Sequence, residues 1–436
     1  MTPEQVLALT SNETTRRNAQ KLARVTAWLS LNASERAAWG EIKGSGTQPY
    51  QVRFDLLDAG YKCSCPSHQQ PCKHTIALML LLYAGDPSVF ARDTQPAWVT
   101  SWLTSRDTKA AKNSQSADKA AGEIADPAAQ SKRITERENK VSAGIDALDL
   151  WLRDLVRGGF DGLPNRDATF WEAPAARMVD AQARGLANQL QEMAKIAQMG
   201  SGWANKLLER AGILYLWLEG YRHQETLSPD LRTDVRSIVG WNQKQEDLLD
   251  LPFVRDQWLV LSQRVHEEDR AEIQRTWLRG LTTKQTALLL DFSFNNQPFE
   301  LKLPGGMCFE ADLIYYPSHF PQRALIRERR RTIPTQNMIA GDSIPTALAA
   351  YADAISRQPW LSLFPMLLAD VYPLRTETGW ILRDAEGHAL SIGQYVENGW
   401  KLLALSGGYP LTIFGEWNGE RLLTLSAWVN GRMLLL

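Results

Sequence analysis

The feature that most constrains this chain is a cluster of metal-ligating side chains within twelve residues near its N-terminus. Residues 61–74 contain Cys63, Cys65, Cys72 and His74, in the pattern C-x-C-x6-C-x-H. In an extended segment, residues two apart point to the same side, so the sulfurs of the first pair can face one ion. The loop that follows turns the chain back and brings in the second pair at the start of a predicted helix.

This donor set predicts one zinc ion. Zn²⁺ prefers four ligands in a tetrahedron and is commonly bound by cysteine thiolates and histidine imidazoles. Four protein ligands leave no open position for water or substrate, so the ion is expected to be structural. Its role would be to fold a segment that is too short to build its own core.

Other interpretations of the cluster are less consistent with the spacing. Buried cysteines are ordinary core residues, but three of them beside a histidine are an unusual group. A disulfide between cysteines two apart would be strained. A catalytic Cys–His pair needs neither of the other thiols. His68, in the middle of the loop, is the one competing ligand.

Length and composition set the broad class. With 436 residues the chain is expected to hold two to four domains, and 44% hydrophobic and 22% charged residues are typical of a globular protein. The formal net charge of −1 gives no electrostatic reason to expect nucleic acid or an anionic membrane as partner. We see neither a signal peptide nor a long apolar run, and expect a cytoplasmic protein without a membrane segment. The chain has only four cysteines, and this small number argues against a disulfide scaffold.

Patterning along the chain predicts an α+β multidomain protein. Residues 105–140 have no aromatic side chain and are rich in Ala, Ser, Lys, Asp and Gln, which is typical of a linker. Apolar residues at helical spacing then run from Val141 to Leu218. The expected division is an N-terminal region 1–104 with a small ββα finger at about 38–84, the linker 105–140, a helical domain 141–250, and a mixed domain 251–436 that ends in an antiparallel sheet.

Several local elements follow from the same patterns. Tyr50, Val52 and Phe54 alternate with polar residues and predict a strand. Asn418-Gly419 and two similar dipeptides predict hairpin turns near the C-terminus. Ser11 or Asn12 is expected to cap a helix. The remaining expectations are helices at Pro3–Leu9, Glu13–Leu29, Thr75–Tyr83 and Ala271–Arg279, strands at 287–294, 310–316 and 323–327, and turns at Glu386-Gly387 and Asn430-Gly431.

The metal-type segment resembles a SWIM-type zinc finger, whose pattern C-x-C-x(n)-C-x-H follows a two-stranded element and precedes a helix. The resemblance covers about a tenth of the chain, and carries the ligand roles to Cys63, Cys65, Cys72 and His74. It implies a finger that binds one zinc and contacts DNA or protein. The rest of the chain resembles the long tails of bacterial SWIM-finger proteins, which are often encoded beside MoxR-type AAA ATPases and von Willebrand A-domain proteins. Because 62 residues precede Cys63, we do not expect the nuclease domain of a SWIM-containing transposase in this chain.

Other candidate sites carry less chemistry. Arg323, Arg327, Arg329, Arg330 and Arg331 form the densest basic cluster, which could bind phosphates or an acidic partner, or could be a solvated strand end. The histidines outside the cluster are isolated, and no sequence motif of a hydrolase, kinase or phosphate-binding loop is present. We therefore expect no catalytic residues, no small-molecule substrate and no cofactor besides zinc.

Three functional hypotheses remain. The first is a non-enzymatic interaction protein, in which the finger and the helical middle contact a protein partner, such as a MoxR-type ATPase system. The second is nucleic-acid binding through the finger. Residues 40–80 contain four basic and three acidic side chains, and three thiolates with one Zn²⁺ add −1, so this region is close to neutral, which favours the first hypothesis. An enzyme in the C-terminal part is the third, with no residue pattern to support it.

Overall fold

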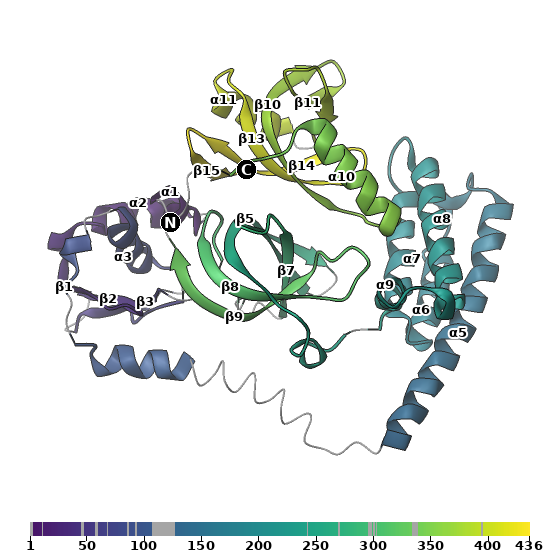
Figure 1. The fold of residues 1–436 in the computed structure, drawn as a ribbon, viewed down its shortest axis with the longest axis horizontal. Coiled ribbons are helices and arrows are strands. Elements are labelled where there is room, and N and C mark those ends of the chain that lie inside the picture. Colours follow the sequence, from purple (N-terminus) through teal and green to yellow (C-terminus); the bar gives the residue numbers. More distant parts are fainter. Residues whose placement is uncertain are drawn as a thin grey trace.

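The computed structural model describes residues 3–10, 12–44, 48–56, 60–67, 69–84, 87–91, 94–106, 127–241, 243–268, 271–294, 299, 301, 303–333, 339–393 and 396–436. An α+β multidomain architecture is confirmed (Figure 1). A four-stranded sheet with helices lies at one end, a helical bundle at the other, and two antiparallel sheets lie between them. No helix in these ranges has the length and apolar character needed to cross a membrane.

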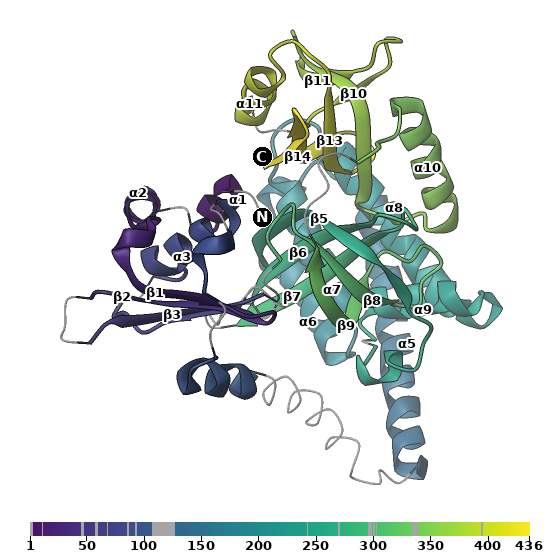
Figure 2. The ribbon, with the colours of Figure 1, turned by 60° about the vertical axis from the view of Figure 1, so that its left-hand side comes forward.

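The N-terminal region is an antiparallel sheet in the order β1-β2-β3-β4, with α2 and α3 on one face (Figure 2). Helical residues 97–106 cover the other face, where Trp39 packs with Val99 and Leu103. The elements are α1 (Pro3–Ala8), α2 (Glu13–Leu22), β1 (Trp28–Ala33), β2 (Ala37–Ile42), β3 (Tyr50–Asp55), β4 (Tyr61–Cys63) and α3 (Lys73–Ala84). The expected strand around Val52 and the helix after His74 are both confirmed.

Two local expectations here have different outcomes. The side chain of Asn12 accepts a hydrogen bond from the Thr15 amide at 2.9 Å and caps α2, as expected; Ser11 lies outside the described residues. The expectation that this helix continues to Leu29 is wrong, because α2 ends at Leu22 and β1 begins at Trp28. Trp28 is buried in the core and donates its indole N–H to the Leu22 carbonyl, so tertiary packing overrides the helical pattern.

The middle of the chain is a helical bundle with a core of its own. Its helices are α5 (Pro127–Gly158), α6 (Thr169–Asp180), α7 (Arg184–Ala197), α8 (Trp203–Arg222) and α9 (Pro229–Val239). The apolar stripes predicted from helical spacing lie inward: Ile145, Leu148, Leu190 and Leu214 are all at most 1% exposed. Helix α7 approaches α9 closely at Gly185, where an added Cβ would lie 1.8 Å from the Ile238 carbonyl oxygen.

Helix α5 begins inside the segment that the composition suggests is a linker, 105–140; residues 107–126 lie outside the described residues. Polar contacts explain why this part of the helix is ordered against the bundle. The guanidinium of Arg137 lies 3.9 Å from the ring centre of Trp241 and donates to the Gly240 carbonyl at 2.9 Å. Glu138 accepts hydrogen bonds from Tyr221 and Arg236. Such polar contacts leave no periodic apolar pattern in the sequence, so this part of the helix could not be predicted from periodicity.

The C-terminal part, 251–436, contains two antiparallel sheets. The first has the order β7-β6-β5-β8-β9 and is strongly curved, with a single bridge between Leu288 of β7 and Arg323 bringing its two edges together. Its strands are β5 (Val254–Glu268), β6 (Ala271–Gly280), β7 (Thr286–Phe294), β8 (Cys308–Tyr315) and β9 (Ala324–Ile333). The expected helix at Ala271–Arg279 is wrong: this segment is β6, which pairs with strands on both sides and buries Trp277 and Leu278.

The second sheet has the order β12-β11-β10-β13-β14-β15, and α10 (Ile344–Arg357) and α11 (Val396–Ser406) pack against it. All three expected hairpin turns are found between paired strands. The strands are β10 (Phe364–Thr376), β11 (Gly379–Arg383), β12 (Ala389–Ser391), β13 (Leu411–Trp417), β14 (Leu422–Val429) and β15 (Arg432–Leu435).

Buried polar groups connect the parts. Glu416 of β13 is 5% exposed and accepts hydrogen bonds from Trp277 Nε1 at 2.7 Å and from Arg275 at 3.0 Å, which links the two C-terminal sheets. Ser426 Oγ donates to the Leu261 carbonyl at 2.7 Å across the same interface. The Asp234 carboxylate of α9 accepts from the His319 amide at 2.9 Å and links the bundle to the first sheet.

Asp312 in β8 provides a test of the five-stranded sheet. It is 2% exposed and accepts two hydrogen bonds from Arg255, at 2.7 and 2.9 Å, and one from Arg330 at 3.2 Å. These contacts lower the pKa of Asp312 to about 2, and the hydrogen bonds from Arg255 have the largest effect. The folded pKa lies below the unfolded value of about 3.9. The ionised Asp312 therefore stabilises the folded state fully above about pH 3.9, and this contribution is lost as the pH falls towards 2.

We predict that Asp312→Asn lowers the free energy of unfolding at neutral pH by about 1–3 kcal/mol, since charge-assisted hydrogen bonds are lost. The variant should also lose less stability than the wild type between about pH 4 and pH 2. Urea unfolding at several pH values measures both effects. Glu328→Gln is the control: Glu328 is exposed and pairs with Arg330 at the surface, so a change above about 0.5 kcal/mol is not expected. Equal losses in both variants would contradict the assignment.

Candidate metal centre

The structure brings Cys63, Cys65, Cys72 and His74 together. Cys63 is the last residue of β4, and Cys65 follows two residues later. Cys72 immediately precedes α3, and His74 lies in the first turn of that helix. One ligand atom from each of the four residues lies within 4.8 Å of all the others. The arrangement predicted from the spacing is therefore formed by one strand end and one helix start.

The size of the cluster fits a zinc ion. Sulfur and nitrogen atoms bound tetrahedrally at about 2.3 and 2.1 Å lie roughly 3.5–3.8 Å from one another. His74 Nδ1 is 3.8 Å from the sulfur of Cys63 and 3.9 Å from that of Cys72. Three thiols and one imidazole are also the donor chemistry of a structural zinc site. These four residues would hold a single Zn²⁺, with no open position for catalysis.

The electrostatics of the three thiols fit the same ion. A hydrogen bond between Cys63 and Cys72 raises the pKa of Cys63 and lowers that of Cys72, so the two thiols do not ionise together. Burial raises the pKa of Cys65. Zinc binds thiolates, and its positive charge offsets the repulsion among three of them. The cluster is therefore arranged for a cation that allows all three thiols to ionise.

Surrounding residues fix the ligands in place. Cys72 and His74 are buried, at 1% and 6% exposure, and the Tyr50 ring centre lies 5.3 Å from that of His74. The Cys72 sulfur is 3.4 Å from the Thr75 hydroxyl oxygen. The position of Cys72 at the start of α3 also favours its thiolate form, because the positive end of the helix dipole lies there.

The loop between the two ligand pairs is held by a residue that the spacing did not identify. Gln69 accepts a hydrogen bond from the Thr15 hydroxyl at 2.8 Å and donates to the Thr10 hydroxyl at 3.1 Å. At the start of the loop, the Gln51 amide donates to the Ser64 hydroxyl at 2.8 Å. Gln69 and its partners are more than fifty residues apart in the sequence, so no local sequence pattern indicates these contacts. His68, the competing ligand, lies outside the described residues.

Helix α3 is buried on nearly every side. From His74 to Leu81 every residue is at most 7% exposed, and only Lys73 is exposed at the start. A helix that is apolar all round is stable only inside a protein. Its core cluster is shared with buried residues of the five-stranded sheet, including Trp258 and Phe309. The Thr332 hydroxyl of β9 also donates to the Leu56 carbonyl, at 2.9 Å.

Most of the predicted basic cluster, which lies in and just before β9, is engaged in internal contacts. Arg330 pairs with Asp312 and Glu328, and Arg331 pairs with Glu310 at 2.9 Å. Arg329 lies over the Phe309 ring. Arg327 and Arg323 lie over Phe253 and Tyr316, at 5.0 and 4.2 Å from the ring centres. This distribution does not make one continuous phosphate-binding surface.

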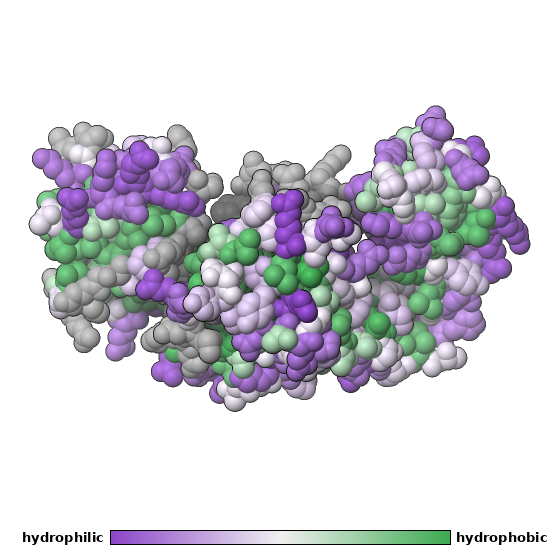
Figure 3. Space-filling model, turned by 90° about the horizontal axis from the view of Figure 1, so that it is seen from above, coloured by the Kyte–Doolittle hydropathy of each residue, from purple (hydrophilic) through white to green (hydrophobic). Residues whose placement is uncertain are grey.

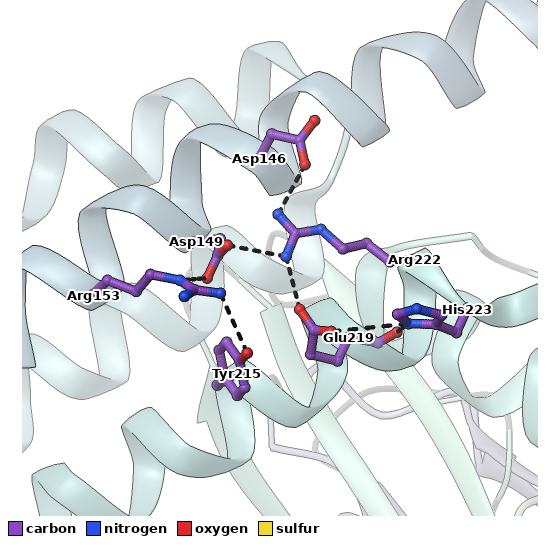
Figure 4. Close-up of polar contacts among 7 residues, drawn as sticks. All are labelled: Asp146, Asp149, Arg153, Tyr215, Glu219, Arg222 and His223. Atoms are coloured by element: carbon purple, nitrogen blue, oxygen red, sulfur yellow. Dashed lines mark hydrogen bonds and ion pairs between the residues drawn. The ribbon is translucent and has the colours of Figure 1, made fainter.

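Figure 4 shows another group of charged residues, which joins α5 to α8. Arg222 donates to Asp146, Asp149 and Glu219 at 2.7–3.0 Å, and these contacts raise its pKa, the one with Asp146 most. Arg153 donates to Asp149 at 2.9 Å and to the Tyr215 hydroxyl at 3.3 Å. Both guanidiniums have acceptors within the network, and the exposed His223 lies beside Glu219. It is best explained as a link between two helices.

The fourth cysteine belongs to neither group. Cys308 lies in β8, is 1% exposed, and has its pKa raised to about 11 by burial. It is outside the metal cluster found in the described part of the chain. A buried neutral thiol of this kind is a packing residue.

Comparison with known protein families supports these assignments. Residues 50–83 match the SWIM zinc finger, and residues 136–239 match the SWIM-associated four-helix bundle domain. The first match contains all four residues of the metal cluster, and the second extends from α5 to the end of α9. No curated protein and no solved structure matches the chain. The chain thus combines a zinc-binding SWIM finger with a SWIM-associated bundle.

We predict that the purified protein contains one zinc ion per chain and that Cys72→Ser and Cys63→Ser lose most of it. Removal of one thiolate from a four-ligand site weakens binding and leaves buried ligands unpaired. Metal analysis by mass spectrometry of protein purified without chelator measures the content. Helix α3 should then become susceptible to proteolysis, since metal binding and local folding are coupled.

Two variants are controls for this experiment. Cys308→Ser changes a buried thiol outside the cluster and should retain the zinc. His68→Ala should also retain it, because the cluster is complete without that side chain. A wild-type protein without zinc, or loss of zinc on His68→Ala with retention on His74→Ala, would show that the ligand assignment is wrong.

Proposed function

We propose that this zinc-binding SWIM-finger protein is a non-enzymatic protein-interaction protein of the cytoplasm. The observation that carries the proposal is the burial of α3. A finger that reads DNA from the major groove inserts the exposed face of a helix. Here the finger helix has no such face, because residues 74–81 are all buried within the protein. The zinc ion therefore stabilises a module whose contacts with a partner use other surfaces.

Exposed apolar side chains on the bundle supply such a surface. On α8, Leu208, Tyr215 and Leu216 are 54%, 38% and 43% exposed, and on the neighbouring α5, Leu150 is 61% exposed. Arg153 of α5 contacts Tyr215, so the two sets lie on adjacent helices. We call these four residues the α5/α8 face. In the view from above, hydrophobic residues are visible on several parts of the molecule, including the bundle (Figure 3). Grouped exposed apolar residues commonly mark protein-binding surfaces.

The finger also has an exposed rim, made of the loop between its ligand pairs. Pro66, Ser67 and Gln70 are exposed there, as is Ser64 within the first pair, while the ligands are buried or half-buried. The Gln69 contacts hold its part of this loop, and a bound zinc would restrain the ligands on either side. We propose that the rim and the α5/α8 face together contact the partner. An ATPase system of the MoxR and von Willebrand A-domain type is the partner that we would test first.

Nucleic-acid binding is the second candidate, favoured by Lys62 and Lys73. Both are exposed and border the metal cluster, so they could contact phosphates. Mobility-shift titrations at low salt with single- and double-stranded DNA and RNA test this candidate. Binding that weakens in the double variant Lys62→Glu/Lys73→Glu would favour nucleic acid over the first proposal.

We predict that the full-length protein co-purifies with a stoichiometric protein partner at native expression, and that Leu208→Asp/Leu216→Asp abolishes the association. Burying two added carboxylates in an interface is expected to cost several kcal/mol, enough to weaken binding by at least about 100-fold. Quantitative mass spectrometry of the purified material measures the ratio. Val179→Asp, which changes an exposed valine on α6, is the matched control. Absence of a stoichiometric partner, or equal loss in the control, would contradict the proposal.

A further inference from the structure

A cleft of about 620 Å³ lies where α9, the five-stranded sheet and the segment after α10 meet. Its walls include Trp241, Gln243, Phe292, Tyr316, Phe320 and Arg323. We call it the junction cleft. Its volume is in the range of ligand sites, which often lie between domains. We propose that the junction cleft binds an extended acidic peptide segment of a partner protein, with Arg323 pairing with an Asp or Glu side chain. This rests on the proposed protein-interaction function, but uses a site distinct from the finger and the α5/α8 face.

Arg323 is the charged group that the ligand would meet. Its guanidinium lies 4.2 Å from the ring centre of Tyr316, which fixes its plane and direction. In the described ranges it has no carboxylate or carbonyl acceptor. Arg330 and Arg331, on the strand that follows Arg323, both have carboxylate partners. An oriented guanidinium without an acceptor at the wall of a cleft is suited to bind a carboxylate in a bidentate manner.

The acidic side chain among the described lining residues of the cleft is Asp234. Asp234 is 7% exposed, and one of its carboxylate oxygens accepts the His319 amide hydrogen at 2.9 Å. Its role is to hold the loop before β9 against α9. Because Asp234 is buried whereas Arg323 is half-buried, the charge that a ligand can reach at the wall of the cleft is that of Arg323, and this favours an acidic ligand over a basic one.

The remaining walls suit a peptide backbone and apolar side chains. Phe292 is 44% exposed, and Phe320 and Tyr316 add aromatic surface. The side-chain oxygen of Gln243 is buried and has no hydrogen-bond partner among the described residues. A buried unpaired acceptor costs stability unless a ligand donor reaches it, and a peptide N–H is such a donor.

Strand β7 offers further main-chain partners on the side of the cleft. The Leu288 amide donates outward to the Gln322 carbonyl at 2.7 Å, away from the neighbouring strand β6. Because direction alternates along a strand, the main-chain groups of Leu290 and Phe292 also point outward. Within the described residues these groups have no main-chain partner on that edge. A strand edge with free donors and acceptors can pair with an extended peptide.

The test is selection of short random peptides by phage display on the full-length, zinc-loaded protein, followed by anisotropy titration of the enriched sequences. We expect the enriched peptides to contain Asp or Glu, and Arg323→Glu to weaken their binding by at least about tenfold. Replacing the acidic residue of the peptide by Lys should restore binding to Arg323→Glu. N-methylation of the peptide backbone should weaken binding to the wild type.

Arg327→Glu is the matched control. Arg327 lies on β9 and, like Arg323, stacks over an aromatic ring, but this ring is Phe253, outside the cleft. Its substitution should leave peptide binding unchanged. No enrichment, enrichment of peptides without acidic residues, equal loss in both variants, or competition by free succinate as effective as the peptide would each overturn the inference. Peptide binding without a co-purifying partner would contradict only the proposed function, and a stoichiometric partner without peptide binding would contradict only the cleft.

Discussion

The structure of the N-terminal region depends on how the metal cluster fixes helix α3. This helix is apolar on all sides, so it is stable only when the sheet, α1, α2 and the neighbouring domain surround it. Its first turn carries His74, and Cys72 immediately precedes it, so the ion joins the helix start to the end of β4. Because its core is shared with the five-stranded sheet, the free energy of zinc binding stabilises more than the finger. This explains how two ligand pairs in a short segment can organise a much longer stretch of chain.

The metal centre could be predicted from the sequence because its determinants are local. The spacing of Cys63, Cys65, Cys72 and His74 alone restricts the geometry, and the structure adds only their separation. The bundle stripes and the hairpin turns were predictable for the same reason, since helical periodicity and Asn-Gly dipeptides act over a few residues. In each of these cases local preference and tertiary structure agree.

Predictions failed where distant partners decide the structure. Segment 271–279 forms β6 because strands on both sides pair with it, although its own pattern is ambiguous. Trp28 begins β1 because it packs into a core formed with residues far along the chain. The charged start of α5 is held by Trp241 and Tyr221, about a hundred residues later. Gln69 shows the same effect within the finger, through its contacts with Thr10 and Thr15.

The arginines in and just before β9 show why a charge cluster must be interpreted residue by residue. In the sequence the five are equivalent, and together they suggest phosphate binding or solvation. In the structure Arg330 and Arg331 complete ion pairs within the sheet, and their charges are neutralised locally. Arg323 alone combines an oriented guanidinium, the absence of an acidic partner among the described residues, and a place in a cleft. Since a paired charge offers little to a ligand, we place the proposed recognition at Arg323, which lies in the cleft, rather than at Arg330 or Arg331.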